Sequence, residues 1–188
     1  EAIRQAGNEN NVRTGFYAQV ISYGYRKLNS SETLYHVNVG LAYGCTEINY
    51  FAWGTPNEVL CPGFGDGVID RNGNPTDLYY AIKEINRYAH TIGPTLVKLR
   101  AAEVYHSGAN STNPVYQRIP QNFFVQSDSY IILSLMEHKI TGRNYLMVVN
   151  KYMNAPQTIG LRFTDVGSLS EVNQTTGNLT PIGNEYKN

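Results

Sequence analysis

One tryptophan and two acidic residues that follow it are the side chains of this sequence that could do chemistry at a ligand site. Trp53 ends a short apolar run, and Glu58 and Asp66 lie on the stretch behind it. An indole offers a flat surface on which the apolar face of a sugar ring can stack. A carboxyl group can give or take a proton in catalysis. The competing interpretations are a core tryptophan and two solvated loop carboxylates.

The elements around Trp53 predict a parallel α/β arrangement. Residues 48–53 are rich in β-branched and aromatic side chains, which is typical of a short buried strand. Residues 31–45 before it and residues 76–92 after it have the apolar spacing of amphipathic helices. Residues 12–22 are apolar on both parities and form the first predicted strand. We expect the two strands to pair in parallel, with their carboxyl ends at the same edge.

Local signals set the predicted ends of these elements. Asn29 with Glu32 three residues later predicts a capping box at the start of the helix over residues 31–45. Gly93 and Pro94 should stop the helix that begins near residue 76, and residues 95–100 should form one more helical piece. The stretch between Trp53 and that helix is rich in glycine and proline, which predicts a long loop with a functional role.

From residue 103 onward the apolar period switches to two, which predicts an all-β region. Turns at residues 141–143 and 176–178 each contain a glycine and predict hairpins. Short antiparallel strands at this density are typical of a β-sandwich. The predicted strands cover residues 104–106, 123–126, 130–137, 145–151, 157–163, 168–172 and 179–182. The sequence therefore predicts two domains, residues 1–102 and residues 103–188.

Composition argues against several classes of function. Fifteen basic and fifteen acidic residues balance, so we expect neither a nucleic-acid partner nor an anionic membrane surface. The four histidines are scattered without ligand spacing, so we expect no metal site. No glycine-rich phosphate loop follows a strand, and we expect no cofactor. Cys45 and Cys61 are too few for a disulfide scaffold, and each is predicted to be a small buried side chain.

The predicted parallel part is too small to bury its own apolar surface. Two strands with two or three helices fall far short of a closed eight-stranded barrel, which takes roughly 250 residues. An open doubly wound sheet also needs more strands. We therefore expect either that a preceding part of a larger protein completes the sheet or that a second chain does so. A self-contained new fold is the alternative.

Three segments resemble one enzyme family. Residues 38–53, "NVGLAYGCTEINYFAW", are similar to the last helix and strand of (β/α)8-barrel glycoside hydrolases, where a strand ends in tryptophan. The segment "GDGVIDRNGNPTDLYYAIKEIN" looks like their final loop and helix. "VYHSG", "NYLMVVNKYMN" and "TTGNLTPI" resemble the β-sandwich that follows such barrels. The resemblance implies an α/β plus all-β chain, the last strands and helices of a barrel followed by an antiparallel β-sandwich.

The resemblance also implies where a site would lie. Barrel glycosidases carry their functional residues at the carboxyl ends of the strands, which assigns Trp53 and Gln19 to substrate binding. Tyr23 and Arg26 follow the first strand and would contact sugar hydroxyls or a catalytic carboxylate, although Arg26 could instead pair with Glu32. Gln19 stands where such an enzyme has a carboxylate. Hydrolysis needs two carboxyls, so most catalytic groups would lie outside this chain, with Glu58 and Asp66 as weak candidates.

These expectations lead to three functional hypotheses. The favoured one is a glycoside hydrolase, or the carboxyl-terminal fragment of one, that acts on an oligo- or polysaccharide. The second is a carbohydrate-binding barrel protein that has lost its catalytic carboxylates. The third is a β-sandwich that acts alone as an interaction module. A secreted or periplasmic location is favoured over the cytoplasm, but the cysteine count leaves the compartment open.

Overall fold

The computed structural model describes residues 1–22, 27–108 and 116–182. These residues form two compact units. The first comprises residues 1–41 and 45–89, and the second comprises residues 42–44 and 90–188. The division falls inside a helix, whereas the sequence places the domain change at residue 103. In the described part of the chain, no helix is both long and apolar enough to cross a membrane.

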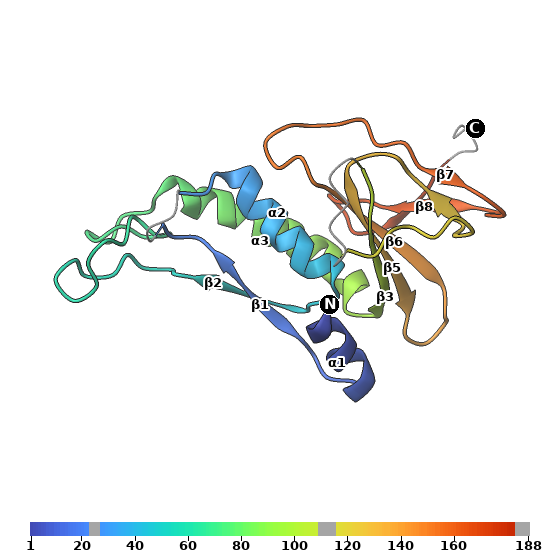
Figure 1. Cartoon of the computed structure of the whole chain (residues 1–188). Helices are drawn as coiled ribbons and strands as arrows, with labels where there is room; N and C mark the ends of the chain where they lie inside the picture. The colour runs from blue at the N-terminus through green and yellow to red at the C-terminus, as the bar shows by residue number, and fades with distance from the viewer. Residues whose placement is uncertain (23–26, 109–115, 183–188) are drawn as a thin grey trace. The chain divides into compact units, whose positions relative to one another are not determined.

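The first unit is built on a parallel strand pair. After helix α1 (Ala2–Asn10), strand β1 (Gly15–Gln19) pairs with strand β2 (Glu47–Phe51), and helix α2 (Ser30–Ala42) connects them (Figure 1). The register matches Gly15 with Glu47 and Gln19 with Phe51. The predicted parallel pairing is therefore confirmed. A crossover helix is needed here because parallel strands cannot be joined by a tight turn.

One face of this strand pair is covered by helices. Phe16 of β1 packs so closely on α2 that a methyl group added at Gly40 would lie 2.2 Å from a carbon of the Phe16 ring. Val20, on the same parity as Phe16, is buried with Val68 and with Ile82 of helix α3 (Asp77–Leu96). Phe16 of β1 and Val20, the residue after β1, therefore contact the two helices from the same face, because side chains alternate between the two faces of a strand.

Helix α3 runs past its predicted stop. Pro94 lies inside the helix, which ends at Leu96, and the Val97 amide still donates to the Gly93 carbonyl at 2.9 Å. Proline removes one backbone hydrogen bond from a helix and clashes with the preceding turn. Because α3 ends two residues later, at Leu96, the proline disturbs only the last turn. The helical piece predicted over residues 95–100 is also wrong, because strand β3 already begins at Leu99.

The second unit is a set of small antiparallel sheets. Strands β3 (Leu99–His106), β5 (Ile131–His138) and β6 (Asn144–Asn150) form a three-stranded sheet, in which β5 is central (Figure 1). Strand β4 (Val125–Gln126) pairs with β7 (Arg162–Phe163), and β8 (Leu169–Val172) pairs with β9 (Leu179–Ile182). Gly142 and Gly177 have positive φ in the two predicted turns, where only glycine is unstrained, and the hairpins β5–β6 and β8–β9 are confirmed.

One apolar cluster of this unit lies on one face of the three-stranded sheet, and Leu99, Ala101 and Met136 form a second cluster on the other face. Tyr105, Ile131 and Leu133 are buried together with Val125 of β4. Partly buried apolar side chains from the loops on either side of β4 and β7 complete it: Ile119, Phe123, Phe124, Ile159 and Leu161. Residues 157–161 form no strand, although the sequence predicts one over residues 157–163. Their apolar side chains pack on the core without pairing in a sheet.

The expected fold class is wrong. The sequence and its family resemblance predict the end of a (β/α)8 barrel followed by a β-sandwich. The described residues hold three helices, one two-stranded parallel sheet and several small antiparallel sheets, and a barrel remnant is not evident among them. A sandwich needs two extended sheets face to face, and two of the antiparallel sheets consist of strands of only two and four residues. The alternating apolar pattern predicts individual strands. It does not determine how many of those strands join one sheet, which is why the sandwich prediction is wrong.

Candidate functional site

The carboxyl ends of β1 and β2 bring together two of the residues singled out from the sequence. Gln19 is the last residue of β1 and lies opposite Phe51, the last residue of β2. The next amide along, that of Val20, donates to the Phe51 carbonyl at 2.7 Å. Trp53 follows two residues later, so Gln19 and Trp53 lie at the same end of the strand pair. Their functional roles stay predictions.

Trp53 contacts one neighbouring ring and is 50% exposed. The ring of Tyr79, from the first turn of α3, meets it edge-on with centroids 6.3 Å apart, and Tyr80 meets Tyr79 edge-on at 5.4 Å. Tyr79 is itself packed against the buried cluster beneath. We call Trp53, Tyr79 and Tyr80 the aromatic row. A half-exposed indole that contacts a packed tyrosine ring suits stacking by a ring-shaped ligand.

The loop between β2 and α3 returns to Trp53 and is fastened there. The Ile69 amide donates to the Trp53 carbonyl at 2.9 Å, and the Thr55 amide donates to the Ile69 carbonyl at 2.9 Å. The Thr55 hydroxyl accepts a hydrogen bond from the Gly67 amide at 2.8 Å. A methyl group added at Gly67 would lie 2.7 Å from the Ala52 carbonyl oxygen, so only glycine fits. The backbone around Trp53 is therefore ordered by contacts on both sides.

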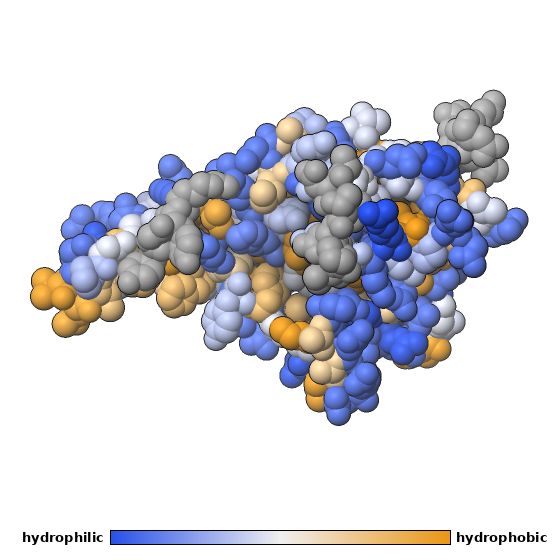
Figure 2. All heavy atoms as spheres, viewed as in Figure 1, coloured by the Kyte–Doolittle hydropathy of each residue, from blue (hydrophilic) through white to orange (hydrophobic). Residues whose placement is uncertain are grey.

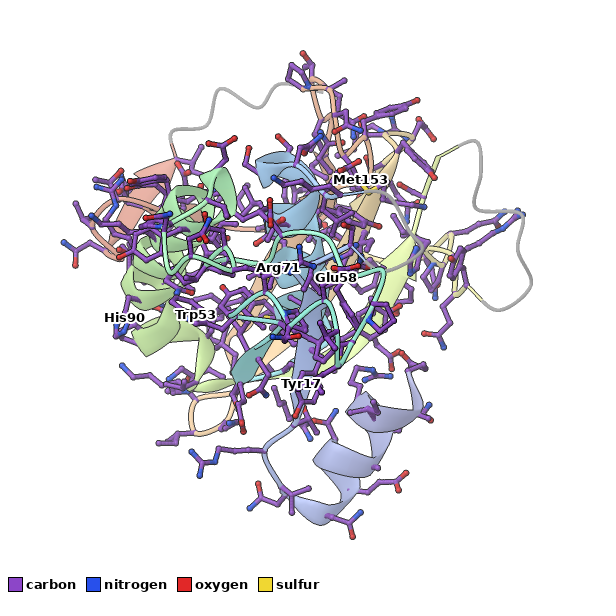
Figure 3. All side chains as sticks on the ribbon, turned by 90° about the vertical axis from the view of Figure 1, so that its left-hand side faces the viewer. Tyr17, Trp53, Glu58, Arg71, His90 and Met153 are labelled. Carbon is purple, nitrogen blue, oxygen red and sulfur yellow. The ribbon has the colours of Figure 1, made fainter. Side chains whose placement is uncertain are left out.

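Arg71 organises the outer part of this loop, which sequence reasoning missed. Its Nε donates to the Pro56 carbonyl at 3.0 Å and its Nη2 donates to the Phe64 carbonyl at 2.7 Å. Nη2 also pairs with the Glu58 carboxylate, and Figure 3 shows these two side chains together, with Trp53 to one side. Glu58 in turn accepts the Gly63 amide at 3.1 Å. No local sequence signal indicates this set of contacts, because its partners come from separate turns of the loop.

The two candidate catalytic carboxylates differ in their surroundings. Glu58 is occupied by Arg71 and by a backbone amide, which suits it to holding the loop. Asp66 is exposed, and no hydrogen bond to it is found in the part of the chain that the structure describes. Asp70, near the loop's end, has its pKa lowered chiefly by the Asn74 backbone amide. Neither Glu58 nor Asp66 shares a buried site with a second carboxylate among the described residues, whereas acid–base hydrolysis requires such a pair.

The outer tip of the loop is apolar. Val59 and Leu60 are 88% and 81% exposed, and Figure 2 shows strongly apolar surface at the far end of the loop region. Cys61 beside them is a free, exposed thiol, so its predicted burial is wrong, whereas Cys45 is buried as predicted. Cys61 is exposed because it lies in the turn that Asn57 closes, in which the Asn57 carbonyl accepts the Cys61 amide at 2.8 Å.

The second face of the strand pair is open. Tyr17 on this face is 76% exposed and Phe51 is 51% exposed. Gln19 lies on the same face by parity, and its side-chain amide donates to the Ile21 carbonyl at 2.9 Å. Sequence reasoning missed Tyr17 and Phe51, because it expected both faces of these strands to be covered. Tyr23 and Arg26, the remaining predicted binding residues, lie outside the described residues.

Comparisons with known proteins and a search for metal-binding groups add no identification. Over residues 1–22, 27–108 and 116–182, no group of three or more His, Cys, Asp or Glu side chains could hold a metal ion. No protein-family model, no curated protein and no solved structure matches this chain.

Proposed function

We propose that this chain binds an oligo- or polysaccharide on the aromatic row at the carboxyl ends of β1 and β2. The observation that carries the proposal is that Trp53 is half exposed, while its ring contacts Tyr79 and its backbone carbonyl accepts the Ile69 amide. An exposed aromatic side chain usually loses conformational entropy when it binds a ligand. A ring that is already fixed by its neighbours loses less, which favours binding. The resemblance of residues 38–53 to a glycoside hydrolase segment supports the same ligand class.

Sugars fit this surface for a physical reason. A pyranose ring has an apolar face of C–H groups and an equatorial rim of hydroxyls. The indole of Trp53 can cover the apolar face, and the phenol groups of Tyr79 and Tyr80 can exchange hydrogen bonds with the rim. The balanced charge of the chain suits a ligand that is recognised by stacking and hydrogen bonds.

The experiment uses the fact that the chain has one tryptophan. We expect neutral oligosaccharides of several linkages, titrated in turn into the full chain, to include at least one that shifts the tryptophan emission saturably and protects it from acrylamide. Calorimetry then compares variants. Trp53→Ala should lose about tenfold or more in affinity for that sugar, and Ile140→Ala, which removes an exposed apolar side chain of the second unit, should bind normally.

Two results would overturn the proposal. One is a panel in which no sugar changes the Trp53 emission. The other is a sugar that binds as tightly to Trp53→Ala as to the unchanged chain. Circular dichroism of the variant shows whether it is folded, and a milder variant, Trp53→Phe, keeps an aromatic ring and should recover part of the affinity.

Glycosidic hydrolysis is the second proposal, and the sequence resemblance favours it. In that case the described residues bind sugar and the catalytic carboxyls come from another segment or a second chain, because Glu58 is paired with Arg71. The sugar that binds should then yield new reducing ends only when that partner is present. A chain that hydrolyses the sugar by itself would show that the catalytic carboxyls lie within these residues.

A further inference from the structure

A buried lysine lies at one end of the three-stranded sheet of the second unit. His106 ends β3, Tyr130 comes just before β5 begins, and Lys151 comes just after β6 ends. The register pairs His106 with Ile132 and Ile131 with Asn150. These three residues therefore lie at the same end of the sheet formed by β3, β5 and β6 (Figure 1).

Aromatic faces surround the lysine. Its Nζ lies 4.2 Å from the centroid of the Tyr130 ring and 5.7 Å from that of the Tyr116 ring. Tyr116 stacks on the His106 imidazole, with centroids 4.2 Å apart and planes within 7° of parallel. Tyr152 packs on Tyr130 at 5.0 Å. We call Lys151 and its three tyrosines, Tyr116, Tyr130 and Tyr152, the lysine–tyrosine cluster.

The ammonium group of Lys151 lacks an acceptor. Lys151 is 9% exposed, and its buried Nζ makes no hydrogen bond in the structure as described. Burial lowers the pKa of this amine. Contacts with the tyrosine faces offset part of the cost of burying the charge. The three N–H donors of an ammonium group still need acceptors when water is excluded, so the cluster is incomplete by itself.

No carboxylate among the described residues bonds to the Lys151 ammonium group. In the described part of this unit, Glu137 pairs with Arg100 and Asp128 pairs with Arg162. The stretch of sequence between His106 and Tyr116 contains neither Asp nor Glu. A carboxylate from a bound ligand is therefore the group that would match this site in charge.

We propose that the lysine–tyrosine cluster is a second sugar site that takes an acidic sugar, with the carboxylate on Lys151 and the sugar ring against a tyrosine face. A single ammonium group matches the single charge of a carboxylate, whereas a phosphate usually takes several donors. The flat tyrosine walls suit the apolar face of a ring. This site goes beyond the proposed function and does not rest on Trp53.

Access to Lys151 runs past the exposed members of the cluster. Tyr116 and Tyr152 are 40% and 52% exposed, whereas the amine itself is buried. A ligand carboxylate can therefore reach Nζ only when one of these rings turns aside. Binding should move tyrosine ring resonances as well as those of the lysine, which gives the experiment a second signal.

The experiment titrates the full chain with D-glucuronate, D-glucose and acetate at constant ionic strength and follows the lysine Cε–Hε resonances by NMR. The Lys151 signal is identified by its absence in Lys151→Met and by the ring-current shift expected from its tyrosines. We expect glucuronate and acetate to shift it saturably and glucose to leave it unchanged. Glucuronate should bind more tightly than acetate, because only glucuronate has a ring to stack.

Variants separate this site from its alternatives. Lys151→Met should lower glucuronate affinity about tenfold or more, the cost of one charge-assisted hydrogen bond. Lys139→Met, which removes an exposed lysine bound to the Val97 carbonyl, should leave the glucuronate affinity unchanged. The proposal is overturned if no titrant shifts the Lys151 signal saturably, if glucose shifts it as glucuronate does, or if Lys151→Met binds equally well. The ring-current shift from the tyrosines also identifies the Lys151 signal on the unchanged chain, so the test stands even if Lys151→Met fails to fold.

Discussion

Asn29 and Glu32 close the start of α2 reciprocally. The Asn29 amide donates to the Glu32 carboxylate at 2.9 Å, and the Glu32 amide donates to the Asn29 side-chain oxygen at 2.9 Å. Glu32 is fully buried. The start of α2 sets where this helix leaves the loop after β1. The pair therefore stabilises the crossover between the two parallel strands that carry the candidate site.

The first prediction concerns this cap. Asn29→Ala should lower the free energy of unfolding by about 1 kcal/mol, because the Glu32 amide loses its acceptor. Urea unfolding followed by circular dichroism measures the change. Ser31→Ala, an exposed neighbour in the same turn, should shift the free energy by less than about 0.5 kcal/mol. Equal effects of the two variants would show that the capping box adds nothing.

The second prediction concerns Arg71. Arg71→Gln should loosen the loop between β2 and α3, since Pro56, Glu58 and Phe64 all lose their contact with the guanidinium. Hydrogen exchange over residues 56–66 should become several-fold faster, while the global free energy of unfolding changes by less than about 1 kcal/mol because the pair is exposed.

A matched control exists for this variant. Arg87 pairs with Glu84 on the exposed side of α3, three residues apart. Arg87→Gln removes an arginine and an ion pair on α3, so we expect exchange over residues 56–66 to stay unchanged. If Arg71→Gln also left that exchange unchanged, the arginine would be a surface contact and the loop would be ordered by its backbone alone.

The third prediction concerns Tyr50 and alkaline pH. Burial raises the pKa of Tyr50 to about 12, whereas an unfolded tyrosine titrates near about 10. The unfolded chain therefore loses this proton first as pH rises. The stability that Tyr50 contributes should be complete below about pH 10 and decline as pH rises toward about 12. Its hydroxyl, which donates to the Asn86 side-chain oxygen at 2.7 Å, favours the same protonated form.

Tyr50→Phe supplies the comparison for the alkaline range. The variant keeps the ring in the cluster with Val20, Val68 and Ile82 and removes the ionisable group. The free energy of unfolding, measured by urea titration at several pH values from neutral to about 11, should fall more steeply for the unchanged chain than for Tyr50→Phe. Parallel curves would mean that Tyr50 titrates normally in the folded state. The Tyr152→Phe variant, which alters an exposed tyrosine, should follow the unchanged chain.

The features that sequence alone determined are local ones. The α2 cap depends on two residues three positions apart, and the hairpin turns depend on glycines that can adopt positive φ. The parallel pairing of β1 and β2 followed from two apolar strands joined by a helix, a connection that favours few other arrangements. That pairing also placed Gln19 and Trp53 at the same end of the strand pair.

Tertiary structure decided the remaining features, because they depend on contacts between residues far apart in the chain. Pro94 stays helical, and the predicted barrel remnant and sandwich give way to small separate sheets. The pairing of Arg71 with Glu58, the support of Trp53 by Tyr79 and the burial of Lys151 among tyrosines have no periodic or motif signal. A sequence pattern records which face of an element is apolar. Only the folded chain decides which distant side chain meets that face, since packing and charge pairing act through space.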